Sequence, residues 1–406
     1  MKVSLNKSES SVPLLALMLN WNAITGTIEL LGRIPALEFL SAFSNITVVF
    51  SIIFLMLTFL LTITNTENIK KYIIILIWLV LFLLSIFLTP AIRSMAPRAF
   101  IYYVNNIFCI AVLLQSVSDL ASLVEKLKKY IPINLLYSAM LWIVGINGEV
   151  YSMSFSYGTM VSMLLCLVLV LMKKEKRIWY FLSFMFILGT NFKYGSRGSF
   201  ICCILAVLLY YFLSATNKKI KYLCLFIFVA TIISIFWGTI LEALLQVFPK
   251  SRNLIILLQG NVFYGSGREE IYAKLLGEFY HNPFAIRGLY SDRVLLSTSL
   301  SDIDIMWGSY SHNVFIELLY QWGVWSIPII IVAGAFMIRV FLQAKKETES
   351  VKTVLILAYS FSIGQLLISS SYLITPSFGL LLGILLWSNR NKNRRNVIAI
   401  EWLAET

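Results

Sequence analysis

The chain has little charge for its length. Charged residues make up 13% of its 406 residues, while hydrophobic residues make up 59%. A soluble domain carries about 25% charged residues and could not bury this much apolar surface. The composition therefore excludes an ordinary soluble protein and predicts a chain that lies largely within a membrane.

Histidine and cysteine are also scarce, with two and five residues. The sequence contains no Walker loop, dinucleotide fingerprint, HExxH helix, GxSxG elbow or cluster of metal ligands. We therefore predict no cofactor and no metal, and a substrate that carries its own leaving group. All the cysteines fall in apolar segments, where they serve as small packing residues. They are Cys109, Cys166, Cys202, Cys203 and Cys224.

Long apolar runs are abundant. A run of about 20 apolar residues can cross the hydrocarbon core as a helix, and the sequence predicts twelve such spans. The first is expected to remain as an anchor, because no cleavable signal peptide is evident before it. The spans are expected at 12–30, 42–64, 71–89, 99–121, 133–148, 154–172, 176–190, 198–214, 219–239, 318–342, 351–373 and 375–388.

The predicted fold is all-α: a polytopic membrane protein with twelve transmembrane helices. Spans one to nine occupy 1–239, and spans ten to twelve occupy 318–390. Between them, 240–317 forms a large periplasmic or extracellular loop with a short helix, and 391–406 forms a basic cytoplasmic tail. A long loop of this kind is usually functional when it is folded.

The basic residues divide between two alternating sets of loops. Of the 33, 22 fall on one set, and 17 of these are lysines. By the positive-inside rule this set is cytoplasmic, so both termini are predicted inside a bacterial plasma membrane. The external set holds 11, eight of them arginines. Guanidinium binds phosphate and carboxylate oxygens in a fork, so this set predicts an anionic ligand. Because the basic clusters lie beside apolar spans, they indicate orientation and lipid contact, and no nucleic acid.

Arg197 is the first candidate site residue. It lies between Gly195 and Gly198 in a short external turn, at the start of a predicted span. The amides at a helix start favour an anion, and the glycines let a ligand approach the backbone. A tight turn with an arginine reaching outward explains the pattern equally well.

Arg268 is the second candidate. It lies in the first turn of a helix predicted to begin at Ser266, with Glu269 as its capping-box partner, and to end at His281 before Pro283. A cation is unfavourable at the positive end of a helix. A bound phosphate or a neighbouring glutamate would offset that cost, and an ordinary Arg–Glu surface pair is the alternative.

His312 is the candidate base. It lies just before span ten, with Ser311 as the predicted helix cap, and its place near a helix start favours the neutral imidazole. A neutral imidazole can accept a proton from a hydroxyl. A single histidine is otherwise often a buried, satisfied residue. Glu149, in the outer turn between spans five and six, is an alternative base or a sugar-binding carboxylate, and the residues alone leave the choice open.

Taken in order, Ser196-Arg197-Gly198, Ser266-Gly267-Arg268 and Ser311-His312-Asn313 resemble the O-antigen polymerase and ligase superfamily (Wzy and WaaL types), over 145–375. The resemblance implies a metal-independent glycosyltransferase whose donor is an oligosaccharide linked to undecaprenyl pyrophosphate. It implies that Arg197 and Arg268 hold the pyrophosphate and that His312 activates the attacking hydroxyl.

The same resemblance implies further substrate contacts from Arg287, Arg293, Glu149 and Asn313. Many relatives carry Glu-Pro-Ser between the fifth and sixth spans, where this chain has Ser154-Phe155-Ser156. The expected partners are the polyprenyl-pyrophosphate-linked oligosaccharide, membrane lipids and a chain-length regulator protein.

Polymerisation of repeat units into O-antigen or capsular polysaccharide is the favoured function. A ligase that transfers the glycan to lipid A core is the nearest alternative. A twelve-helix transporter or flippase is the alternative from another class. A major-facilitator protein, however, usually has its long loop inside the cell between two six-span halves, whereas the long loop predicted here is external and follows span nine.

Overall fold

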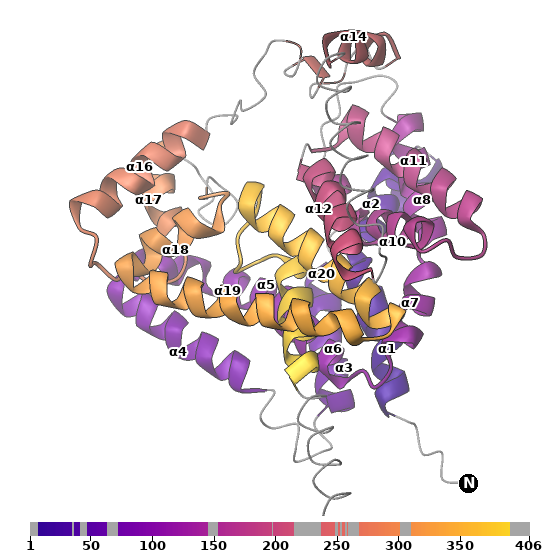
Figure 1. The fold of residues 1–406 in the computed structure, drawn as a ribbon. Coiled ribbons are helices and arrows are strands. Elements are labelled where there is room, and N and C mark those ends of the chain that lie inside the picture. Colours follow the sequence, from indigo (N-terminus) through magenta and orange to yellow (C-terminus); the bar gives the residue numbers. More distant parts are fainter. Residues whose placement is uncertain are drawn as a thin grey trace, which may run out of the picture.

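The computed structural model of the chain is a bundle of helices (Figure 1). The described residues are 7–34, 36–40, 47–62, 72–144, 153–196, 198–214, 237–247, 251, 254–255, 258, 268–300 and 310–389. Every regular element among them is helical, which confirms the all-α prediction for the part of the chain that is described.

The helices divide between the two halves of the chain. The amino-terminal half contains α1 (Lys7–Leu19), α2 (Trp21–Gly32), α3 (Thr47–Thr62), α4 (Ile73–Leu88), η3 (Pro90–Met95), α5 (Ala96–Tyr103), η4 (Val104–Cys109), α6 (Ile110–Ser116), α7 (Leu120–Lys128), α8 (Ile131–Val144), α9 (Met153–Gly158), α10 (Met160–Leu171), α11 (Arg177–Tyr194) and α12 (Gly198–Leu213). The other half contains α14 (Trp237–Val247), α16 (Arg268–His281), α17 (Ser291–Leu300), α18 (Val314–Trp322), η6 (Gly323–Trp325), α19 (Ser326–Gln343), η7 (Ala344–Lys346) and α20 (Glu349–Ile368). A last apolar helix covers Pro376–Asn389.

Three helical stretches are long and apolar enough to cross a membrane. They are Pro90–Ser116, Val314–Lys346 and Glu349–Ile368, and they overlap predicted spans four, ten and eleven. A bent pair, Ser10–Leu19 with Trp21–Gly32, adds a fourth if it forms one span. Several other predicted spans coincide with apolar helices of 10–17 residues. The described residues therefore do not confirm a count of twelve.

Part of the predicted organisation lies outside the described residues. This applies to most of span nine, to the tail at 391–406 and to much of the external loop. Within that loop, the predicted helix is confirmed as α16, which begins at Arg268 and ends at His281. The helix stops two residues before Pro283, in agreement with the effect of proline on the preceding backbone.

The first predicted span is broken at Asn20. The helices on either side of this residue meet at a bend of 54°. The Asn20 Nδ2 donates to the Ala16 carbonyl at 2.9 Å, and its Oδ1 accepts from the Asn134 Nδ2 at 3.1 Å. Because these bonds satisfy the buried amide, the helix can break inside the bundle.

α20 is the buried helix to which the candidate site is attached. Most of its residues are buried, and Gly364 lets α12 approach closely, since a Cβ there would lie 3.3 Å from the Cys202 Cα. Its 20 residues rise about 30 Å at 1.5 Å per residue, which is close to the thickness of the hydrocarbon core of a bilayer. The two ends of α20 would therefore lie on opposite faces of a membrane that it crosses.

The two ends of α20 contact different parts of the chain. At the amino end, Glu349 pairs with Lys174 from the α10–α11 turn. At the carboxyl end, the Ile368 carbonyl accepts a hydrogen bond from Arg268. Lys174, from the lysine-rich set of loops, thus contacts one end of α20, and Arg268, from the arginine-rich set, contacts the other end.

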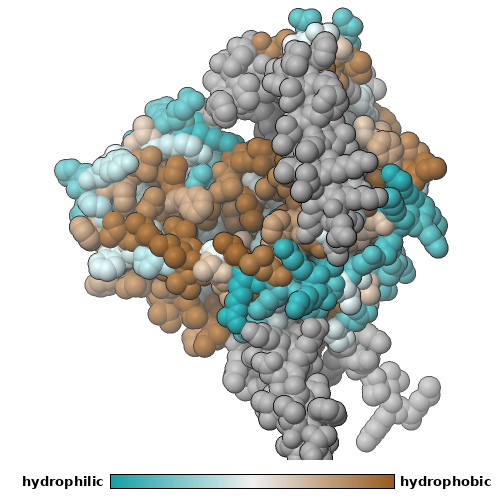
Figure 2. Space-filling model, in the orientation of Figure 1, coloured by the Kyte–Doolittle hydropathy of each residue, from teal (hydrophilic) through white to brown (hydrophobic). Residues whose placement is uncertain are grey.

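Large apolar side chains cover the outside of several helices. Phe87 on α4, Ile178 on α11 and Val332 on α19 are exposed by 82%, 75% and 68%. Figure 2 shows a brown apolar surface over α19, bordered by teal residues near α16 on the left and at the carboxyl end of α19. Soluble monomers rarely expose apolar patches of this extent, so these faces suit contact with lipid.

Candidate functional site

The carboxyl end of α20 is where the three predicted motifs meet. Its last carbonyls and the following Ser369 are approached from the start of α16, from the segment before α18 and from the start of α12. Tyr310 donates its hydroxyl to the Ser369 carbonyl at 2.7 Å. A Cβ on Gly198 would lie 3.6 Å from the Ser369 Oγ. Segments far apart in the sequence therefore form one site.

Arg268 reaches this site from the first residue of α16. Its Nη1 donates to the Ile368 carbonyl, and its Nη2 donates to the Ser369 Oγ at 3.4 Å. The last carbonyls of a helix lack partners within the helix and form its negative dipole end. Contact with the end of α20 therefore offsets the unfavourable place of a cation at the start of α16. Because a guanidinium has five N–H donors, it can bind an anion as well.

His312 adopts an unusual backbone conformation. Its φ is +52°, in the left-handed region that residues with a Cβ seldom adopt. Its ring centroid lies 3.9 Å from that of Tyr310, and its Nδ1 is buried without a hydrogen-bond partner. A buried ring nitrogen left without a partner is costly. In native structures such a group is usually explained by a catalytic role or by a water molecule or ion that completes the bond.

The surroundings keep His312 neutral. Burial, helped by the positive charges of Arg268 and Arg293, lowers the pKa of its imidazole from the ordinary 6.5 to about 3. A hydrogen bond with the Ser369 backbone acts in the opposite direction. The neutral form agrees with the prediction from the sequence, although burial, and not the helix start, is the main cause.

Two buried charged residues at the start of α17 support the segment that carries His312. Asp292 and Arg293 are both fully buried. The Asp292 Oδ2 accepts from the Ser311 amide at 3.4 Å, and the Arg293 Cζ lies 4.8 Å from the centroid of the Tyr310 ring. Buried charges require partners, and such partners fix a conformation. Arg293, predicted as a substrate contact, is therefore placed where it holds the His312 segment.

α18 contributes to a buried polar network that the sequence did not predict. Glu317 and Gln321 are fully buried. The Gln321 Nε2 donates to the Asp292 Oδ1 at 2.8 Å, and its Oε1 accepts from the Tyr372 hydroxyl at 2.7 Å. Glu317 accepts from the Ser371 hydroxyl at 2.5 Å. The available signal was an acid and an amide four positions apart in an apolar helix, which mark a buried polar face.

Asn313 is the N-cap of α18. Its Oδ1 accepts from the amides of Phe315 and Ile316 at 2.9 and 3.3 Å, and its Nδ2 donates to the Leu367 carbonyl at 3.1 Å. The prediction that Ser311 caps this helix is therefore wrong, because the helix begins directly after Asn313. Asn313, predicted as a substrate contact, uses its side chain to join α18 to α20.

Arg287 donates hydrogen bonds at the carboxyl ends of two other helices. Its guanidinium donates to the carbonyls of Tyr320, Glu278 and Asn282 at 3.2, 2.8 and 3.4 Å. These carbonyls belong to the carboxyl-terminal regions of α16 and α18, where basic side chains often complete the backbone hydrogen bonding. The structure thus places Arg287 between these helix ends and does not bring it to the end of α20.

Two predicted site residues, Arg197 and Glu149, lie outside the described residues. The neighbours of Arg197 are placed, however. Ser196 donates its amide to the Ser156 Oγ at 2.5 Å, and Gly198 begins α12. Ser156 belongs to the element that replaces the Glu-Pro-Ser of the superfamily, so this element contacts the turn that precedes α12.

The site combines a guanidinium, a neutral imidazole and the end of a buried helix. A guanidinium can bind phosphate oxygens through two N–H groups, and a neutral imidazole can accept the proton of a hydroxyl. Among the described residues, no three His, Cys, Asp or Glu side chains are grouped to hold a metal ion. Comparison with protein-family models, curated proteins and solved structures finds no match for this chain.

Proposed function

We propose that the chain is a membrane glycosyltransferase that polymerises oligosaccharide repeat units carried on undecaprenyl pyrophosphate, at the external face of a bacterial plasma membrane. The observation behind this proposal is the meeting of Arg268 and His312 at the end of α20. One group can bind a diphosphate and the other can accept a proton, and transfer from a lipid pyrophosphate needs both. The resemblance of the three motifs to O-antigen polymerases supports the same function.

In the proposed reaction, the hydroxyl of the acceptor sugar gives its proton to the His312 Nδ1 as its oxygen bonds to the anomeric carbon of the donor. The bond between that carbon and the pyrophosphate oxygen breaks, and its electron pair leaves with polyprenyl pyrophosphate. Arg268, together with Arg197, stabilises the negative charge that develops on the leaving group. Attack from the face opposite the leaving group inverts the anomeric carbon.

Binding of the donor pyrophosphate makes His312 a stronger base. With a pKa of about 3, an imidazole is a weak base at neutral pH. Because the charge of Arg268 contributes to this low value, a diphosphate bound beside Arg268 offsets part of the effect and raises the proton affinity of the ring. His312 is therefore most basic when the donor is in place.

The position of the site favours an enzyme over a transporter. Transporter sites lie near the membrane midplane, at breaks in helices. Arg268 and His312 instead gather at one end of a helix that is about 30 Å long. The lysine-rich turns lie at its other end, so the positive-inside rule assigns the site to the external face.

Alanine substitutions in cells test the proposal, with surface glycans read as ladders on a gel. We expect H312A and R268A to lose the higher rungs. H281A and R93A are matched controls, because His281 and Arg93 are exposed and contribute nothing to the site, and both should give full ladders. Full ladders from H312A and R268A at normal expression would contradict the proposal. Intact polymer that stays on its lipid carrier and fails to reach lipid A core would indicate a ligase.

A further inference from the structure

A cavity of about 610 Å³ opens among the lysine-rich turns. It lies between the junction of α7 with α8 and the α10–α11 turn, and four lysines and two glutamates contribute to its lining. We infer that this cavity binds the headgroup of an anionic phospholipid from the lysine-rich leaflet, with the acyl chains along α11. The residues used in the argument are Lys128, Lys129, Lys174, Lys176, Trp179 and Tyr180.

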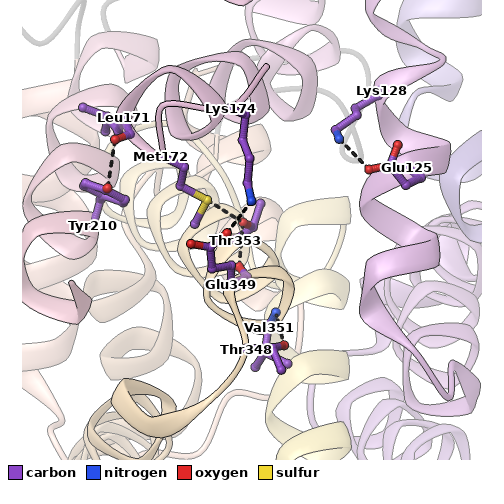
Figure 3. Close-up of polar contacts among 10 residues, drawn as sticks. All are labelled: Glu125, Lys128, Leu171, Met172, Lys174, Tyr210, Thr348, Glu349, Val351 and Thr353. Atoms are coloured by element: carbon purple, nitrogen blue, oxygen red, sulfur yellow. Dashed lines mark hydrogen bonds and ion pairs between the residues drawn. The ribbon is translucent and has the colours of Figure 1, made fainter. Parts of the chain in front are cut away.

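Two lysines in this region form ion pairs with glutamates, and each lysine can bind a lipid phosphate in place of its glutamate. Lys128 pairs with Glu125 on α7, and Lys174 pairs with Glu349 at the start of α20 (Figure 3). Both glutamate side chains are more than 60% exposed. Exposed pairs contribute little to stability, so a lipid phosphate can take the place of either carboxylate at small cost.

Lys129 and Lys176 add two more ammonium groups to the lining. Both residues are exposed. Lys176 has a φ of +60°, and Lys173 in the same turn has a φ of +54°. Glycine fits this left-handed region better than lysine does. The positive-inside rule accounts for the lysines of this turn, and the cavity brings two of them, Lys174 and Lys176, together with Lys128 and Lys129.

An exposed apolar stripe continues from the cavity along α11. Its six members are each at least 40% exposed and recur with the spacing of one helix face. They cover about 12 Å along the helix, close to the ~15 Å depth of one leaflet of the hydrocarbon core. The stripe consists of Ile178, Trp179, Phe181, Leu182, Met185 and Phe186.

A phospholipid accounts for both halves of this surface. A soluble phosphate would occupy the cavity and leave the apolar stripe bare, whereas a lipid covers both. Trp179 and Tyr180 lie where the two halves meet, and these residue types are enriched at the level of the headgroups. Basic pockets on the cytoplasmic side of membrane proteins bind anionic headgroups in this way. The inference is independent of the proposed glycosyltransferase activity. The cavity lies near the amino end of α20, whereas Arg268 and His312 lie at its carboxyl end.

Native mass spectrometry of the purified full-length chain tests the inference, with phosphatidylglycerol and phosphatidylcholine as probes. K129Q/K176Q removes two cavity lysines and leaves both ion pairs intact. We expect phosphatidylglycerol to bind this variant roughly 30-fold more weakly, the equivalent of about 1 kcal/mol for each lysine. Phosphatidylcholine should bind it as it binds the wild type. K126Q/K352Q is the matched control, since it removes the same charge outside the cavity lining.

A second variant tests the apolar half. I178S/L182S keeps every lysine and should also weaken phosphatidylglycerol binding, because acyl contacts are lost. Unchanged binding in K129Q/K176Q or in I178S/L182S would overturn the inference, as would an equal loss in K126Q/K352Q. Displacement of phosphatidylglycerol by inorganic phosphate at equal concentration would overturn it too, by identifying a soluble anion as the ligand.

Discussion

Acidification should destabilise the folded chain through His312, and replacing this residue by glutamine should remove that part of the effect. Burial and the nearby charges of Arg268 and Arg293 lower the pKa of the folded imidazole to about 3, compared with 6.5 for an ordinary histidine. The unfolded chain therefore binds more protons than the folded chain between these two pH values. The stability that depends on neutral His312 is complete above the unfolded pKa and is lost as the pH falls below it.

The size of the effect follows from the shift. Each pH unit below the unfolded pKa costs about 1.36 kcal/mol until the folded pKa is reached. Acidification from pH 7 to pH 5 covers about 1.5 units of that range and should lower the free energy of unfolding by about 2 kcal/mol. Because the side chain is not completely buried, this value is an upper limit.

The assay is reversible unfolding of the purified protein in mixed micelles, at both pH values, for the wild type, H312Q and H281Q. Acidic side chains titrate in all three proteins, so only the differences between them concern the histidines. We expect H312Q to lose up to about 2 kcal/mol less than the wild type on acidification. H281Q is the matched control, because it makes the same substitution at an exposed histidine outside the site, and it should lose as much stability as the wild type does. Equal losses in the wild type and H312Q would refute the reasoning.

Three further predictions concern the stability of the fold and use the same unfolding assay. Asn313→Ala removes the cap of α18 and should lower the free energy of unfolding by about 1–2 kcal/mol; a neutral result would mean that the cap is unimportant. Gly379→Ala would place a Cβ 2.9 Å from the Ile107 Cα and should cost about 1–3 kcal/mol. Gly277→Ala, which would meet nothing within 4 Å, should be tolerated, and equal effects from the two alanines would contradict the packing. Glu349→Gln breaks an exposed ion pair and should change the free energy of unfolding by less than about 1 kcal/mol; a larger loss would show that the pair is structural.

Local sequence patterns predict many of the helices. Apolar runs identify the helical stretches that include α18 with α19 and α20, because the hydrocarbon length sets the length of an apolar helix. Pro283 marks the end of α16, because proline restricts the backbone that precedes it. The cap of α18 was misassigned because serine and asparagine are about equally good caps. Asn313 also donates a hydrogen bond to the Leu367 carbonyl on α20. This tertiary contact could not be predicted from the local sequence.

Tertiary pairing accounts for what the sequence could not predict. Arg268 contacts the carbonyl of a residue 100 positions away, and this contact depends on how α16, α18 and α20 pack together. For the same reason, the sequence could not predict that Asp292 and Glu317 lie in the polar network behind the His312 segment. The sequence did indicate that Arg268 and His312 belong to one site, because the order of their motifs resembles a known superfamily.

The central claim is tested most directly by incubating the purified protein with an undecaprenyl-pyrophosphate-linked repeat unit and separating the products by chain length. The wild type and H281A should form a ladder of glycans and release undecaprenyl pyrophosphate, while H312A should bind the substrate and form no ladder. A wild-type ladder from H312A would contradict the account.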